Sequence, residues 1–112
     1  MSAISEILYN ARKQRNLVLR KVAAAVDIDQ SLISKFEKGE RVPTKEQTIK
    51  LSKFYGIPQK EFLIDIISEK VVRTIQEYEF AETILKVAEE KIEYLNSKRG
   101  FKKQQNNLLD AK

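Results

Sequence analysis

The stretch of chain from Val22 to Gly39 carries the polar side chains that are best suited to recognising a ligand. Within it, Ile33 and Phe36 recur at a spacing typical of a helix that is buried on one side. The other side of this predicted helix presents an amide, two hydroxyls and two ammonium groups, which belong to Gln30, Ser31, Ser34, Lys35 and Lys38. Side chains of these types can form hydrogen bonds with base edges in a groove of DNA.

The sequence lacks most of the residue types that catalysis and metal binding require. The chain contains no cysteine and no histidine, so the usual nucleophile, proton shuttle and zinc ligands are missing. The carboxylates are scattered over helix faces that we expect to be solvated, and no nucleophile and base are paired. We therefore expect no enzyme, no metal site and no cofactor.

Charge is distributed unevenly along the 112 residues, which carry a formal net charge of +5. Residues 1–66 have 12 basic and 8 acidic side chains, residues 67–97 have 4 and 7, and residues 98–112 have 5 and 1. The positive first half fits a polyanionic partner such as DNA, whereas the acidic middle would stay away from it. The length leaves room for one domain and an appendage.

Capping residues and glycines divide the first half into short helices. Asp29 and Thr44 are favourable N-caps, and Gly39 and Gly56 stop helices. Helices are predicted over residues 2–15, 19–26, 30–38 and 45–55, with a fifth that begins at Pro58. The sequence therefore predicts an all-α fold with a five-helix domain over residues 1–65.

The order of short motifs in this domain matches a known pattern without a gap. The pattern includes the small residue Ala23, the core pair Val22 and Ile33, and the runs ISKFEKGERVP and IKLSKFYGI. On these residues, positions 4 to 64 resemble the Cro-type, lambda-repressor-like (XRE) helix-turn-helix family of transcriptional regulators, whose members fold as five-helix DNA-binding domains. The chain departs from the family at Asp27, where glycine is usual, and at Val18 and Leu19, where a Ser or Thr cap and a Gln are usual.

The resemblance implies roles for individual side chains. Residues 30–38 correspond to the recognition helix, whose expected base-reading residues are Gln30, Ser31, Ser34 and Lys35. The expected phosphate-binding residues are Arg20, Lys21, Lys38 and Arg41. In phage repressors of this type, an arginine of the first helix pairs with a glutamate at the end of the recognition helix. The matching residues are Arg12 and Glu37, so the resemblance implies an ion pair that braces the recognition helix.

An apolar stripe continues from Ile64 to Leu95 at steps of three and four, with no glycine or proline between residues 59 and 99. A lone exposed helix would leave half of this stripe in water. Either one long helix pairs with its copy, or two helices broken near residues 77–80 form a small dimerisation bundle, which apolar residues beside the stripe favour. Residues 66–97 are thus predicted as a helical dimerisation segment, with an intramolecular cap on the first domain as the alternative. The expected interface residues are Ile67, Val71, Tyr78, Leu85, Ile92 and Leu95.

Residues 98–112 are expected to form a basic, flexible tail. The N-terminus lacks the apolar run of a signal peptide, and no stretch is apolar for long enough to span a membrane. These observations predict a cytoplasmic, nucleoid-associated protein without a membrane partner.

The function predicted from the sequence is a transcriptional regulator, either a repressor or a controller protein, that binds double-stranded DNA as a homodimer on a palindromic operator. No small-molecule ligand is expected, because residues 66–112 are too few and too regular to form a ligand pocket. The alternative is an antitoxin or another protein-interaction module whose C-terminal helices bind a partner protein.

Overall fold

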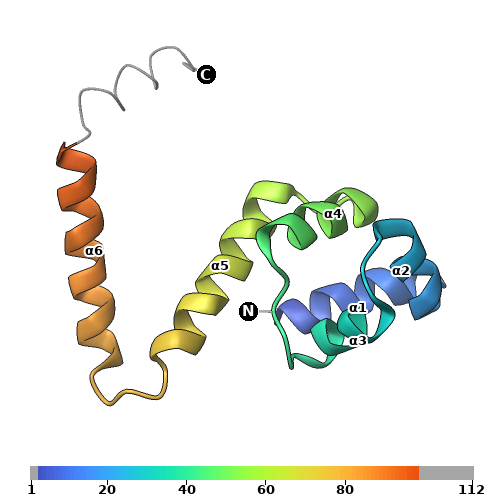
Figure 1. The fold of residues 1–112 in the computed structure, drawn as a ribbon, viewed down its shortest axis with the longest axis horizontal. Helices are drawn as coiled ribbons and strands as arrows, with labels where there is room; N and C mark the ends of the chain where they lie inside the picture. The colour runs from blue at the N-terminus through green and yellow to red at the C-terminus, as the bar shows by residue number, and fades with distance from the viewer. Residues whose placement is uncertain (1–2, 99–112) are drawn as a thin grey trace, which may run out of the picture. The chain divides into compact units, whose positions relative to one another are not determined.

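The computed structural model describes residues 3–98, which form six helices and no strand (Figure 1). The helices are α1 (Ile4–Gln14), α2 (Leu19–Val26), α3 (Gln30–Lys38), α4 (Lys45–Tyr55), α5 (Gln59–Ile75) and α6 (Ala81–Lys98). The chain divides into two compact units, Met1–Arg73 and Thr74–Lys112. The all-α fold class is therefore confirmed, while the expected tail lies outside the described residues apart from Lys98, which ends α6.

Local sequence signals determine where the helices of the first unit begin and end. The carboxylate of Asp29 accepts a hydrogen bond from the backbone N–H of Ser31 at 3.1 Å and so caps α3. At the start of α4, the Gln47 N–H donates to Thr44 Oγ1 at 3.1 Å and the Thr44 N–H donates to Gln47 Oε1 at 2.9 Å. Gly39 ends α3 with a φ of +78°, a left-handed conformation that glycine adopts more readily than residues with a Cβ. As a result, α2, α3 and α4 have the bounds predicted from the sequence.

The turn between α2 and α3 forms without the usual glycine. Asp27 takes the left-handed conformation itself, with φ 55° and ψ 51°. Aspartate tolerates this conformation better than most residues, although at some steric cost. Val18 precedes α2 in an extended conformation and provides no side-chain cap, as expected from the departure at this position.

All five helices of the first unit contribute to one apolar core. Its buried residues are Ile4, Leu8, Val22, Val26, Ile28, Ile33, Phe36, Leu51, Tyr55, Phe62 and Ile66. Two polar residues of α4, Thr48 and Ser52, are buried as well, and the Thr48 hydroxyl donates to the Thr44 carbonyl at 2.7 Å. Because α3 places Ile33 and Phe36 in this core, its remaining face is directed outward.

The first unit extends beyond residue 65, where the sequence placed the end of the first domain. Ile66 is fully buried and packs in the core together with Phe62. The first unit ends only at Arg73, in the last turn of α5. A single helix runs through the expected boundary, and this is why the helical pattern of the sequence gave no sign of where the core ends.

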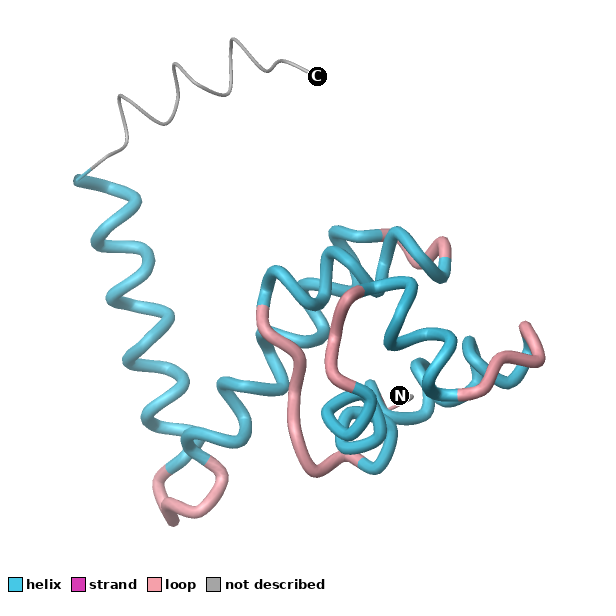
Figure 2. The backbone as a smooth tube through the Cα atoms, turned by 45° about the vertical axis from the view of Figure 1, so that its right-hand side comes forward, coloured by secondary structure: helices cyan, strands magenta, loops and turns pink. Residues whose placement is uncertain are grey.

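In the second half of the chain the helical pattern is interrupted at residues 76–80, the loop that separates α5 from α6 (Figure 2). The Tyr78 N–H donates to the Ile75 carbonyl at 3.0 Å, and the Ala81 N–H donates to the Tyr78 carbonyl at 3.2 Å. The rings of Tyr78 and Phe80 stack with their centroids 5.8 Å apart. Of the two arrangements considered from the sequence, the one long helix is therefore wrong, and two helices form. None of the residues of α6 is buried.

Candidate nucleic-acid interface

One face of α3 packs against α1 and α2 and the other is open. Ile33 and Phe36 are buried, and Leu32 packs half-buried against the same core. On the outward side, the side chains of Gln30, Ser31 and Lys35 are exposed. The side chain of Ser34, on the same side, is half-buried. The structure thus brings the four expected base-reading residues onto one side of α3.

Ser31 has a hydrogen bond within the protein. Its hydroxyl donates to the carboxylate of Asp29, which also accepts its backbone N–H. The hydroxyl bond lowers the pKa of Asp29 below its ordinary value because it stabilises the charged carboxylate. With its proton engaged, Ser31 can offer an acceptor oxygen to a base. Gln30 and Lys35 make no side-chain hydrogen bond within residues 3–98, so both keep their donors for a ligand.

The expected phosphate-binding residues occupy two helix ends. Lys38 and Arg41 lie at and just beyond the C-terminal end of α3, and Arg20 and Lys21 lie in the first turn of α2. All four are exposed, and none takes part in an ion pair within the part of the chain that the structure describes. Cations of this kind can reach a phosphate without first breaking a contact in the protein.

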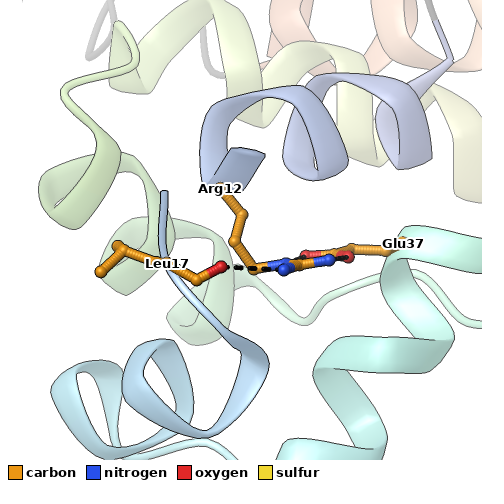
Figure 3. Close-up of polar contacts among 3 residues, drawn as sticks. All are labelled: Arg12, Leu17 and Glu37. Atoms are coloured by element: carbon orange, nitrogen blue, oxygen red, sulfur yellow. Dashed lines mark hydrogen bonds and ion pairs between the residues drawn. The ribbon is translucent and has the colours of Figure 1, made fainter. Parts of the chain in front are cut away.

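Arg12 of α1 and Glu37 of α3 form the ion pair that the resemblance implies (Figure 3). Arg12 Nε donates to Glu37 Oε2 at 2.8 Å, and Arg12 Nη2 donates to Oε1 at 2.9 Å. The third donor, Nη1, bonds the carbonyl oxygen of Leu17 at 2.9 Å. One guanidinium therefore joins α1, α3 and the segment that leads into α2.

The Arg12–Glu37 pair is largely shielded from water, with 12% and 6% of the two side chains exposed. Donating hydrogen bonds to the Glu37 carboxylate raises the pKa of Arg12 above its ordinary value, because the charged guanidinium is stabilised. The ring of Tyr9 lies 5.5 Å from the guanidinium carbon. This planar, two-bond geometry is the strongest form of an arginine–carboxylate contact.

The fold and the arrangement of α2, the turn and α3 agree with a comparison with protein families. A family model described as a helix-turn-helix domain matches residues 6–65. The chain belongs to the helix-turn-helix domain family. Because this is a DNA-binding domain, the prediction of a DNA-binding regulator is supported at the level of the domain. A search of curated proteins and a search of solved structures each gave no match.

Two arginines of the first unit have partners that the sequence did not indicate. Arg15 Nη2 donates to the Tyr55 carbonyl at 2.8 Å, and its guanidinium lies 5.5 Å from the Tyr55 ring. Arg73 Nη2 donates to the Gly39 carbonyl at 2.8 Å. These partners are 40 and 34 residues apart in the sequence, so no local spacing could have revealed them.

Among residues 3–98, no group of three or more His, Cys, Asp or Glu side chains is arranged so that it could hold a metal ion. Within the same residues, no helix has both the length and the apolar character needed to cross a membrane.

Proposed function

We propose that this protein is a Cro-type, sequence-specific transcriptional regulator that binds a palindromic operator as a homodimer and acts as a repressor or controller protein at the nucleoid. The observation that carries the proposal is the helix-turn-helix match over residues 6–65, which includes α3 with its polar, outward face. The Arg12–Glu37 ion pair supports it further, because the pair ties α3 to α1 at the position where phage repressors of this type have one.

In this proposal α3 enters the major groove and its outward side chains read base edges. The amide of Gln30 can pair with adenine through two hydrogen bonds, and the ammonium of Lys35 can reach the acceptors of guanine. Ser31 and Ser34 can serve several bases through their hydroxyl oxygens. The buried Ile33 and Phe36 support the proposal, because they keep the polar face turned away from the core.

Phosphate contacts are assigned to the cations at the two helix ends. With Arg20, Lys21, Lys38 and Arg41 bound in both subunits, eight phosphates are neutralised. At ~0.9 per phosphate, the logarithm of the association constant should fall with the logarithm of salt concentration with a slope of about −7. A slope near −1 for the specific complex would contradict this assignment.

Dimer contacts are assigned to residues 66–97. The six side chains proposed for the interface are each more than 40% exposed in the single chain: Ile67, Val71, Tyr78, Leu85, Ile92 and Leu95. Two of these side chains belong to α5, and the other four belong to the loop at residues 76–80 and to α6. Exposed apolar side chains that recur along a helix are unfavourable in water and typical of an association surface. A dimer would hold two copies of α3 about 34 Å apart, as two half-sites on one face of DNA require.

An antitoxin, or another module that binds a partner protein, is the second candidate. The exposed stripe on α6 favours it to the same degree, because a different protein could cover that stripe. Sedimentation equilibrium of the whole chain separates the two functions. A stable dimer at micromolar concentration supports the regulator, whereas a monomer favours the partner-binding module.

The decisive experiment is selection of binding sites from a random pool of double-stranded DNA. We expect a palindromic consensus. If no sequence is enriched at low salt, the proposal is wrong. Lys35→Ala and Lys38→Ala form a matched pair, since each removes one ammonium from α3. Lys35→Ala should relax the preference at one position of each half-site. Lys38→Ala should weaken all sequences alike and reduce the salt slope of the dimer by about 1.8, from two phosphates at ~0.9 each.

A further inference from the structure

Arg73 connects the last turn of α5 to the end of α3. Its Nη2 group donates a hydrogen bond to the carbonyl oxygen of Gly39 at 2.8 Å. Its Nε group donates to Oε2 of Glu69, one helical turn earlier, at 3.0 Å. The guanidinium is therefore held by its own helix while it contacts α3.

The carbonyl that Arg73 contacts belongs to the C-cap of α3. Carbonyl groups at a helix C-terminus lack partners within the helix and carry partial negative charge, so a guanidinium forms a charge-assisted bond there. The planar fork of arginine can bond Glu69 and Gly39 at the same time. Lysine has a single ammonium on a flexible stem and lacks this fixed geometry.

Arg73 lies in the part of α5 that extends beyond the core. Phe62 and Ile66 of α5 are buried, whereas Val71 and Val72 are 41% and 49% exposed. At 1.5 Å per residue, Arg73 lies about 10 Å beyond Ile66 along the helix axis. A bond at that distance from the buried end restricts the direction of the helix more strongly than one close to it.

We propose that Arg73 is a positioning residue for DNA binding, which fixes the angle between α3 and α5 and thereby the spacing of half-sites that the dimer accepts. This role rests on the homodimer proposed above, in which Ile67 and Val71 of α5 are themselves dimer contacts. With the angle fixed, the two copies of α3 are presented at one separation. Without the Arg73 bond, the dimer tolerates a wider range of spacings.

A direct phosphate contact is the competing explanation for a cation at this place. Arg73 borders a small cavity of about 50 Å³ whose wall also includes Arg41, one of the proposed phosphate-binding residues. The two explanations differ in whether lysine can take the place of Arg73. A phosphate contact needs only positive charge, whereas the bridge between Glu69 and Gly39 needs the arginine fork.

The test compares the wild-type protein with Arg73→Met, Arg73→Lys and Lys53→Met, each as the full chain. Lys53→Met is the matched control, because Lys53 is an exposed cation in the last turn of α4, in the same unit, and is assigned to neither DNA nor dimer contacts. Each protein selects DNA from a pool in which two copies of the wild-type half-site are separated by spacers of graded length. Affinity for a single half-site is measured at several salt concentrations, and amide hydrogen exchange in residues 67–75 provides a readout without DNA.

We expect both Arg73 variants to broaden the selected spacing and to bind the full operator roughly three- to tenfold more weakly, the range for one hydrogen bond. Their affinity for a single half-site should match that of the wild type, and exchange in residues 67–75 should be faster. Lys53→Met should behave as the wild type in each measurement.

Unchanged spacing selection in Arg73→Met would overturn the proposal. A phosphate contact would also overturn it, and its signature is distinct. In that case Arg73→Met binds a single half-site more weakly, its salt slope is smaller by about 0.9, and Arg73→Lys restores both. If the wild type selects no DNA at all, the proposed function is wrong and so is the spacing role. If the wild type selects an operator but the Arg73 variants select the same spacing, only the spacing role is wrong.

Discussion

Removing the Glu37 carboxylate is expected to destabilise the helix-turn-helix domain by about 3–5 kcal/mol. Glu37→Ala deletes two of the three hydrogen bonds of the Arg12 guanidinium, those of 2.8 and 2.9 Å, and leaves only the bond to the Leu17 carbonyl. The Arg12 side chain is 12% exposed, so water can replace little of what is lost. Most of the expected cost arises because a charge stays buried without its partner.

Urea unfolding followed by circular dichroism measures this loss. With an m-value of about 1.5 kcal/mol/M, the expected change lowers the midpoint of Glu37→Ala by roughly 2–3 M. The double variant Arg12→Met with Glu37→Leu is the matched control, since it removes both charges and keeps apolar side chains of similar length. It should recover most of the stability, because a buried ion pair is close to neutral relative to an apolar pair.

Two results would refute this reasoning. One is a loss of less than about 1 kcal/mol in the free energy of unfolding of Glu37→Ala. A loss that small is typical of a solvent-exposed ion pair, so it would mean that shielding from water does not strengthen this contact. A Glu37→Ala protein that folds and binds the selected operator as tightly as the wild type would show that the pair does not brace α3.

Four further predictions concern backbone strain and pH. Gly39→Ala should lower the free energy of unfolding by about 1 kcal/mol, because alanine is strained at φ +78°. Asp27→Gly should raise it by up to about 1 kcal/mol, because glycine removes the steric cost of the left-handed aspartate. Thermal unfolding against the wild type measures both changes. The Ser31 hydrogen bond lowers the pKa of Asp29 from its ordinary 3.8. The stability that Asp29 contributes is therefore present above pH 3.8 and is lost as pH falls through the pKa of the folded state. The difference in stability between the wild type and Asp29→Ala should disappear over that pH range. Burial raises the pKa of Tyr55 from 10.0 to about 12, so the unfolded state loses this proton first and stability should fall between pH 10 and 12. Tyr55→Phe should flatten that fall, and an unchanged alkaline slope would contradict the prediction.

The helices of the first unit could be predicted from the sequence because their signals are local. Asp29, Thr44 and the two glycines act within one turn of their own positions, so the predicted bounds of α2, α3 and α4 agree with the structure. The burial of Ile33 and Phe36 also followed from spacing alone. The ion pair between Arg12 and Glu37 came from the family resemblance, since nothing local links residues 25 positions apart.

Contacts between distant segments were beyond the reach of the sequence. The bonds from Arg15 to Tyr55 and from Arg73 to Gly39 depend on how α1 and α5 pack, which no periodicity encodes. No signal in the sequence marks the end of the first compact unit at Arg73, because α5 continues without interruption from buried to exposed turns. The base-reading and phosphate-binding assignments stay predictions, as they concern contacts with DNA.

The absence of any buried side chain in the 18 residues of α6 has a consequence for regulation. A helix of this length is only marginally stable alone in water, so its formation and its association with a partner are a single equilibrium. For the proposed homodimer, the concentration of associated protein at high dilution grows as the square of the total. In that proposal, occupancy of the operator rises more steeply than the abundance of the protein.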